Sequence, residues 1–124
     1  MEEKIHLKNE WQRVTKFYEQ VDGEGKNKVE ANLARKLAES EYASAFYPYT
    51  SHRALCISPS TDFFEMHKFP MISILHLGNK RFRVEYWEQQ WKERDRQSHE
   101  VEDAQLWNLL ESLLLRMQIE SSSS

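Results

Sequence analysis

The single cysteine and the histidines are the residues best suited to metal binding or nucleophilic chemistry. His52 and Cys56 have the spacing H-x-x-x-C, while His67 and His76 lie in two neighbouring segments that resemble strands. Four residues of a strand span about 13 Å, so His52 and Cys56 could share a face without binding one ion. A lone cysteine also cannot form an intrachain disulfide or a C-x-x-C zinc pair. The sequence therefore predicts no metal site and no cofactor.

Covalent catalysis would require a nucleophile beside a positioned base. Cys56 could meet His76 across neighbouring strands, with Asp62 or Glu65 orienting the imidazole. The chain contains no Gly-x-Ser-x-Gly elbow, no His-Glu-x-x-His helix and no phosphate-binding loop. The sequence leaves enzymatic activity open, but it favours a non-catalytic protein in which Cys56 is a small buried group.

Aromatic residues gather around Pro48, at the expected junction between helices and sheet. Tyr47, Tyr49 and His52 have polar tips and could line a small-molecule pocket, with or without catalysis. The same side chains could instead fill the gap between helix and sheet, with their polar tips in solvent. A small-molecule pocket at these residues is therefore the alternative to protein binding.

The segment 81–87 has the clearest strand-like alternation in the chain. Its apolar residues take one face, so Arg81, Arg83 and Trp87 take the other, about 7 Å apart. Guanidinium groups beside an indole suit an anionic or aromatic partner, and Trp91 would extend the surface. We assign this surface to protein binding, with the tryptophans as buried anchors and the arginines at the rim. An ordinary solvated sheet face is the alternative.

Self-association is a further possibility, because the last predicted helix is apolar around most of its circumference. Such a helix either fills its own core or leaves a stripe for another chain. The residues that would form the stripe are Leu106, Leu109, Leu110 and Leu113.

The charge balance argues against nucleic acid as the main partner. Lys and Arg total 17 against 20 Asp and Glu, a net charge of −3. Residues 80–96 carry six basic and four acidic side chains, a local excess too small to attract a phosphate backbone from solution. Nucleic-acid binding through residues 80–96 is the third hypothesis.

Size and composition indicate one compact unit. The chain has 124 residues, of which 40% are apolar and 12% aromatic, far too many aromatics for a disordered protein. We expect a single domain over residues 1–119 and a disordered serine tail over 120–124. Residues 1–20 hold no apolar stretch that would serve as a signal peptide, and no apolar run is long enough to span a membrane, so we expect a cytoplasmic protein.

Periodicity predicts an α+β fold with the order α-α-β-β-β-β-α. Apolar residues spaced by three and four predict a helix over about the first 21 residues, then a second ending near Pro48 and a third over 103–117. The predicted strands are 54–57, 62–67, 71–77 and 82–87, with 88–99 a loop or an exposed helix. The expected architecture is a four-stranded antiparallel meander with the helices packed on one face.

Overall fold

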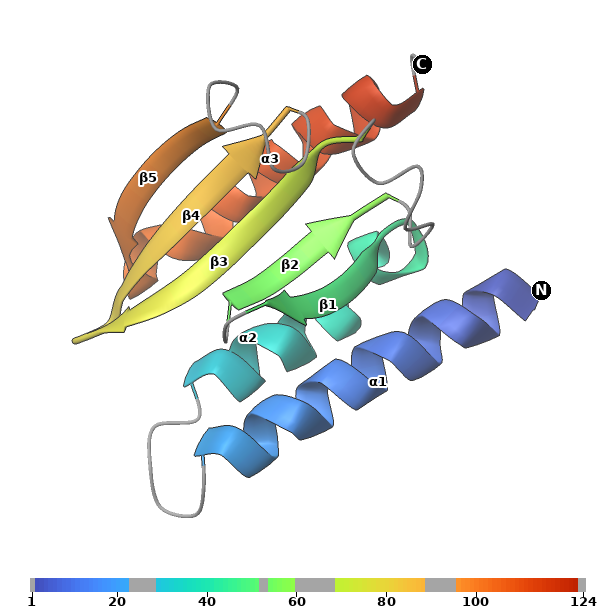
Figure 1. Ribbon diagram of the computed structural model, residues 1–124, viewed down its shortest axis with the longest axis horizontal. Coiled ribbons are helices and arrows are strands. Elements are labelled where there is room, and N and C mark those ends of the chain that lie inside the picture. The colour runs from blue at the N-terminus through green and yellow to red at the C-terminus, as the bar shows by residue number, and fades with distance from the viewer. Residues whose placement is uncertain (1, 23–28, 52–53, 60–68, 89–95, 123–124) are drawn as a thin grey trace.

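The computed structural model describes residues 2–22, 29–51, 54–59, 69–88 and 96–122 (Figure 1). Two helices come first, then a short 3-10 helix, five strands and a last helix. Their bounds are α1 (Glu2–Asp22), α2 (Val29–Ala38), η1 (Glu41–Ser44), β1 (Tyr47–Ser51), β2 (Ala54–Ser58), β3 (Met71–Gly78), β4 (Arg81–Trp87), β5 (Arg96–Glu102) and α3 (Asp103–Ser122). The α+β class is confirmed.

The sheet is an antiparallel meander in the order β1-β2-β3-β4-β5. Its described part has five strands rather than the expected four: β2, β3 and β4 match predicted segments, whereas β1 and β5 were not predicted. Both are edge strands among the described residues, and neither has the apolar alternation that marks a half-buried strand. Pro48 lies in β1, where an edge position tolerates its missing N–H, and β5 is polar because most of its side chains are exposed. The strand predicted at 62–67 lies outside the described residues.

The second helix is shorter than predicted. It ends at Ala38, whereas the apolar spacing suggested that it continued to Pro48. Ser40 begins the separate helix η1, and its hydroxyl accepts a hydrogen bond from the backbone N–H of Tyr42. This cap redirects the chain but keeps Tyr42 buried, so the apolar spacing continues although the α-helix does not.

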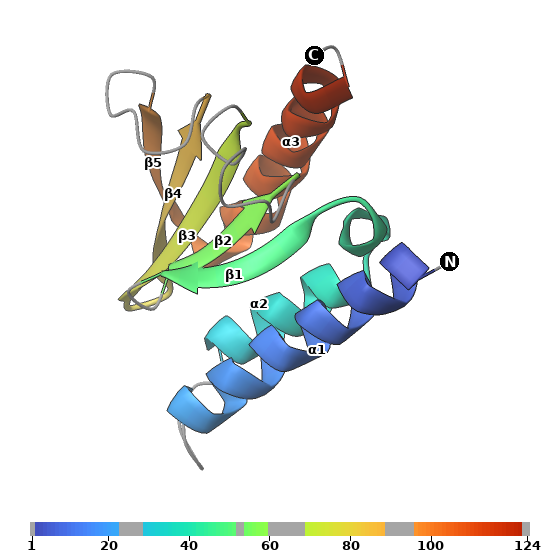
Figure 2. The ribbon, with the colours of Figure 1, turned by 45° about the vertical axis from the view of Figure 1, so that its right-hand side comes forward.

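All three α-helices lie on one side of the sheet, as expected (Figure 2). The apolar stripe of α1, including Trp11 and Tyr18, packs into a core shared with α2, the middle strands and α3. The indole N–H of Trp11 donates to the carbonyl oxygen of Phe46, which joins α1 to the chain entering β1. No helix in the described ranges is long and apolar enough to cross a membrane.

The last helix extends five residues beyond its predicted end at Met117, to Ser122. Residues 120–122, expected in the serine tail, are therefore helical. Arg116 donates to Glu120 one turn later, and Glu120 also accepts from the hydroxyl of Tyr86 on β4. These contacts stabilise the final turns of α3 against the sheet.

The four leucines proposed as a self-association stripe face the chain's own core. Leu106, Leu110 and Leu113 are buried there, and Leu109 packs half-buried against them. They cannot form a surface stripe in this fold. The large apolar residues of α3 that are exposed in the described structure are instead Leu115 and Ile119.

Candidate functional site

The sheet face opposite the helices, here called the outer face, carries the residues that the sequence singled out for partner binding. Strand register places Trp87 of β4 beside Met71 of β3 on one side and Arg96 of β5 on the other. The predicted face of Arg81 and Arg83 is correct, since the alternate residues of β4 are buried under the helices. The outer face divides into a buried half and an exposed half.

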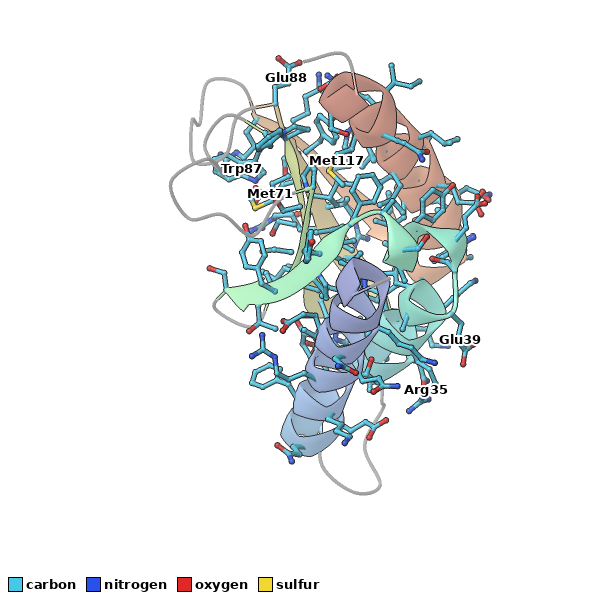
Figure 3. All side chains as sticks on the ribbon, turned by 90° about the vertical axis from the view of Figure 1, so that its right-hand side faces the viewer. Arg35, Glu39, Met71, Trp87, Glu88 and Met117 are labelled. Atoms are coloured by element: carbon cyan, nitrogen blue, oxygen red, sulfur yellow. The ribbon has the colours of Figure 1, made fainter. Side chains whose placement is uncertain are left out.

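The buried half contains Trp87, which is on the predicted face but only 7% exposed. It packs in a small cluster with Cys56, Met71 and Tyr49, separate from the main core. Figure 3 shows Met71 and Trp87 next to each other on the side of the sheet away from the helices. The guanidinium of Arg96 lies 5.4 Å from the centre of the Trp87 ring. The expected anchor is therefore already packed within the chain, and Trp91 lies outside the described residues.

Cys56 belongs to the same packed cluster and is 1% exposed. Burial raises the pKa of its thiol to about 11, outweighing hydrogen bonds with Ser73 and Tyr49 that favour the thiolate. Leu55 and Ile57 on either side of it pack into the core under the helices, as does Ile74, two residues from His76. Cys56 and His76 thus lie on opposite faces of the sheet, because strand side chains alternate. The sequence-based cysteine–histidine pair does not form.

The buried thiol of Cys56 is expected to react slowly with thiol reagents. With its pKa near 11, about one Cys56 in ten thousand is a thiolate at pH 7, so the native protein should react far more slowly with a thiol reagent than the unfolded protein. The native rate should rise about tenfold per pH unit between pH 7 and pH 10. Absorbance-monitored disulfide exchange without and with guanidinium measures the native and the unfolded rate. Repeating the native measurement from pH 7 to pH 10 gives the pH dependence. Fast native reaction at pH 7 would contradict the burial.

The histidine on the helix side makes a different contact. Nδ1 of His76 lies 3.8 Å from a carboxylate oxygen of Glu30 on α2, and its ring lies against Phe82 with 5.0 Å between ring centres. The pair joins α2 to β3 and lies away from Cys56. No group of three or more potential metal-binding side chains occurs within the part of the chain that the structure describes.

The alternative pocket of Tyr47, Tyr49 and His52 is only partly described. Tyr47 and Tyr49 lie in β1, and His52 lies outside the described residues. The hydroxyl of Tyr49 donates to the sulfur of Met71, and burial raises the pKa of that hydroxyl. Tyr49 therefore contributes to the packed cluster. Two cavities, one between α2 and α3 and one between α1 and α2, are lined by other residues.

The exposed half lies toward the β3–β4 turn. Its members, here called the leucine–arginine patch, are Leu75, Leu77, Arg81 and Arg83. Leu77 is 39% exposed, and the guanidinium groups of Arg81 and Arg83 lie 3.6 and 3.7 Å from the carboxylate of Glu100, longer than hydrogen bonds. Two arginines thus share one carboxylate beside an accessible leucine.

Sequence reasoning missed the two leucines of this patch because it took residues 71–77 as a fully buried strand. In the structure β3 alternates: Ile72 and Ile74 enter the core, while Leu75 pairs with Arg83 on the outer face. Leu77 lies where the β3–β4 register shifts, between His76 and Gly78, and its side chain is exposed. The polar residue Ser73, between two core isoleucines, was the signal that could have revealed this alternation.

The basic segment 80–96 is largely neutralised where it is described. Arg96 lies 3.3 Å from Glu85, in addition to the Glu100 contacts of the patch. Lys92 and Arg94 lie outside the described residues.

Comparisons with protein-family models, curated proteins and solved structures find no match to this chain. Functional arguments therefore rest on its own geometry.

Proposed function

We propose that this chain is a non-catalytic protein-binding module that contacts another protein through the leucine–arginine patch. The observation that carries the proposal is an exposed large apolar side chain, Leu77, at the end of β3 that pairs with Arg81. Arg81 and Arg83 lie on a sheet face that no described helix covers. Protein interfaces combine an apolar centre with arginines more often than the rest of a protein surface does.

Arg81 and Arg83 are suited to exchanging their contacts with Glu100 for contacts with a carboxylate of the partner protein. Exposed ion pairs contribute about 0–1 kcal/mol, and Glu100 cannot satisfy both guanidinium groups well at 3.6 and 3.7 Å. A partner carboxylate could form a bidentate pair with Arg83, which is stronger and more directional. The partner would therefore present an apolar side chain flanked by acidic residues. A reducing compartment such as the cytoplasm suits the free thiol of Cys56.

Affinity capture from the cells that produce the protein tests the proposal. We expect a stoichiometric partner protein with the wild type, and at least tenfold less of it with Leu77→Asp or Arg83→Glu, since losing a hot-spot contact costs about 2 kcal/mol or more and about 1.4 kcal/mol corresponds to tenfold. Lys16→Glu is the matched control, because Lys16 is exposed on α1, which packs against the opposite face of the sheet. Thermal melting checks that all three variants remain folded.

Three results would overturn the proposal. The first is partner capture that is unchanged in both patch variants. The second is recovery of the chain alone at a multiple of 14.9 kDa by native mass spectrometry, which would indicate self-association. The third is recovery of nucleic acid whose binding falls steeply with salt, as expected for phosphate contacts.

A further inference from the structure

A second surface feature lies on the helix side of the sheet, between α2 and α3. Figure 2 shows α1 and α2 together near β1 and β2, with α3 apart from them. Between α2 and α3 lies a cleft of about 230 Å³, lined by Leu33 on one side, Leu106 and Trp107 on the other, and Phe82 of β4. An enclosed apolar cavity of about 150 Å³ is large enough to admit benzene, so this cleft, which is open to solvent and lined by both apolar and polar side chains, has the size for an aromatic ring.

Two opposite charges line the same cleft. Lys36 lies one turn after Leu33 on α2, and Asp103 lies one turn before Leu106 and Trp107 on α3. Neither charge forms an ion pair with another residue of the described segments. Both side chains are exposed at the rim, where they can meet a ligand without being buried alone.

The aromatic wall is held in place by its own contacts. The indole N–H of Trp107 donates to Glu111 at 2.6 Å, and the ammonium of Lys36 lies 4.3 Å from the centre of a Trp107 ring. The backbone N–H of Asp103 donates to the carbonyl oxygen of Lys80 at 2.7 Å, which fixes the start of α3 beside the β3–β4 turn. An exposed cation–π contact is weak, so a carboxylate can draw the ammonium of Lys36 away from the ring.

We infer that the α2–α3 cleft binds a small aromatic zwitterion, with an aromatic amino acid as the simplest member of the class. The ring occupies the apolar space against Trp107 and Phe82, the carboxylate meets Lys36, and the ammonium meets Asp103. A ligand with only a negative charge would be repelled by Asp103, and one with only a positive charge by Lys36. The zwitterion alone carries a charge opposite to each of these two side chains.

Nuclear magnetic resonance of the tryptophan indole N–H groups tests the inference, with L-tryptophan as the probe. We expect the Trp107 signal, assigned with Trp107→Phe, to shift with a dissociation constant of roughly 0.01–1 mM, the range for a ligand of this size. Indole, indole-3-acetate and tryptamine, which lack one or both charges, should each bind at least fivefold more weakly. No shift at 10 mM L-tryptophan, or equal binding of indole, would overturn the inference.

Matched variants separate the two charges. Lys36→Met and Asp103→Asn should each weaken L-tryptophan binding about tenfold, since a hydrogen bond to a charged group is lost. Lys36→Met should leave tryptamine binding equal or stronger, and Asp103→Asn should do the same for indole-3-acetate, because each removes a repulsion. Lys16→Met, which removes an ammonium from α1, should change nothing. Binding of L-tryptophan that is unaffected by both cleft variants would contradict the assigned orientation.

Discussion

Replacing Leu114 with alanine is expected to lower the free energy of unfolding by about 2–5 kcal/mol, whereas the same replacement at Leu115 should change it by less than about 0.5 kcal/mol. The two leucines are adjacent on α3, but Leu114 is 0% exposed in the core and Leu115 is 49% exposed. Only Leu114→Ala leaves a cavity among packed neighbours. Urea denaturation of both variants measures the difference, provided that the free energy of unfolding falls with urea concentration at the same rate in each.

This adjacent pair also tests how α3 is oriented. The two positions differ in burial only in the observed orientation of the helix, so equal losses at Leu114 and Leu115 would contradict the packing of α3 on the sheet. A loss at Leu115 that grows with protein concentration would instead indicate that its exposed side is covered by a second copy.

The Trp87→Ala variant is expected to unfold more easily, by about 3–5 kcal/mol, because it removes a large side chain that packs with Cys56, Met71 and Tyr49. The sequence-based assignment of Trp87 as a partner-binding anchor implies the opposite, a variant that stays folded and loses partner binding. Leu77→Ala, at a large apolar residue of β3 that is 39% exposed, is the matched control and should cost less than about 1 kcal/mol. Chemical denaturation distinguishes the two positions.

A stable Trp87→Ala variant that had lost its partner would restore Trp87 as the anchor and displace the leucine–arginine patch. A Trp87→Phe variant helps here, since it keeps most of the packing and removes the indole N–H. Its stability should lie between that of Trp87→Ala and the wild type. Partner capture with Trp87→Phe should remain at the wild-type level if Leu77 and the arginines make the contact.

Local periodicity was sufficient to predict the elements that have one buried face. The stripe of α1, the alternation of β4 and the start of α3 are all written in residues a few positions apart, and the structure has them as predicted. The α+β class and the placement of the helices on one face follow from the order of these elements. The face of Arg81 and Arg83 was likewise determined, because the period of a strand is two.

Edge strands and accessibility could not be predicted in the same way. β5 is mostly exposed, so its sequence has no apolar pattern, and its pairing with β4 exists only in the folded sheet. Burial of Trp87 depends on neighbours 16 and 31 positions away, Met71 and Cys56, which no local pattern brings together.

The sequence by itself determined which side chains share a face, since side-chain direction follows from backbone geometry a few residues long. Only the tertiary structure decided which of them meet solvent. It buried Trp87, separated Cys56 from His76 by the thickness of the sheet, and brought Lys36 of α2 to Asp103 and Trp107 of α3. The burial of a side chain, and the meeting of side chains from different helices and strands, depend on contacts between distant segments. These contacts form only when the helices and strands pack together.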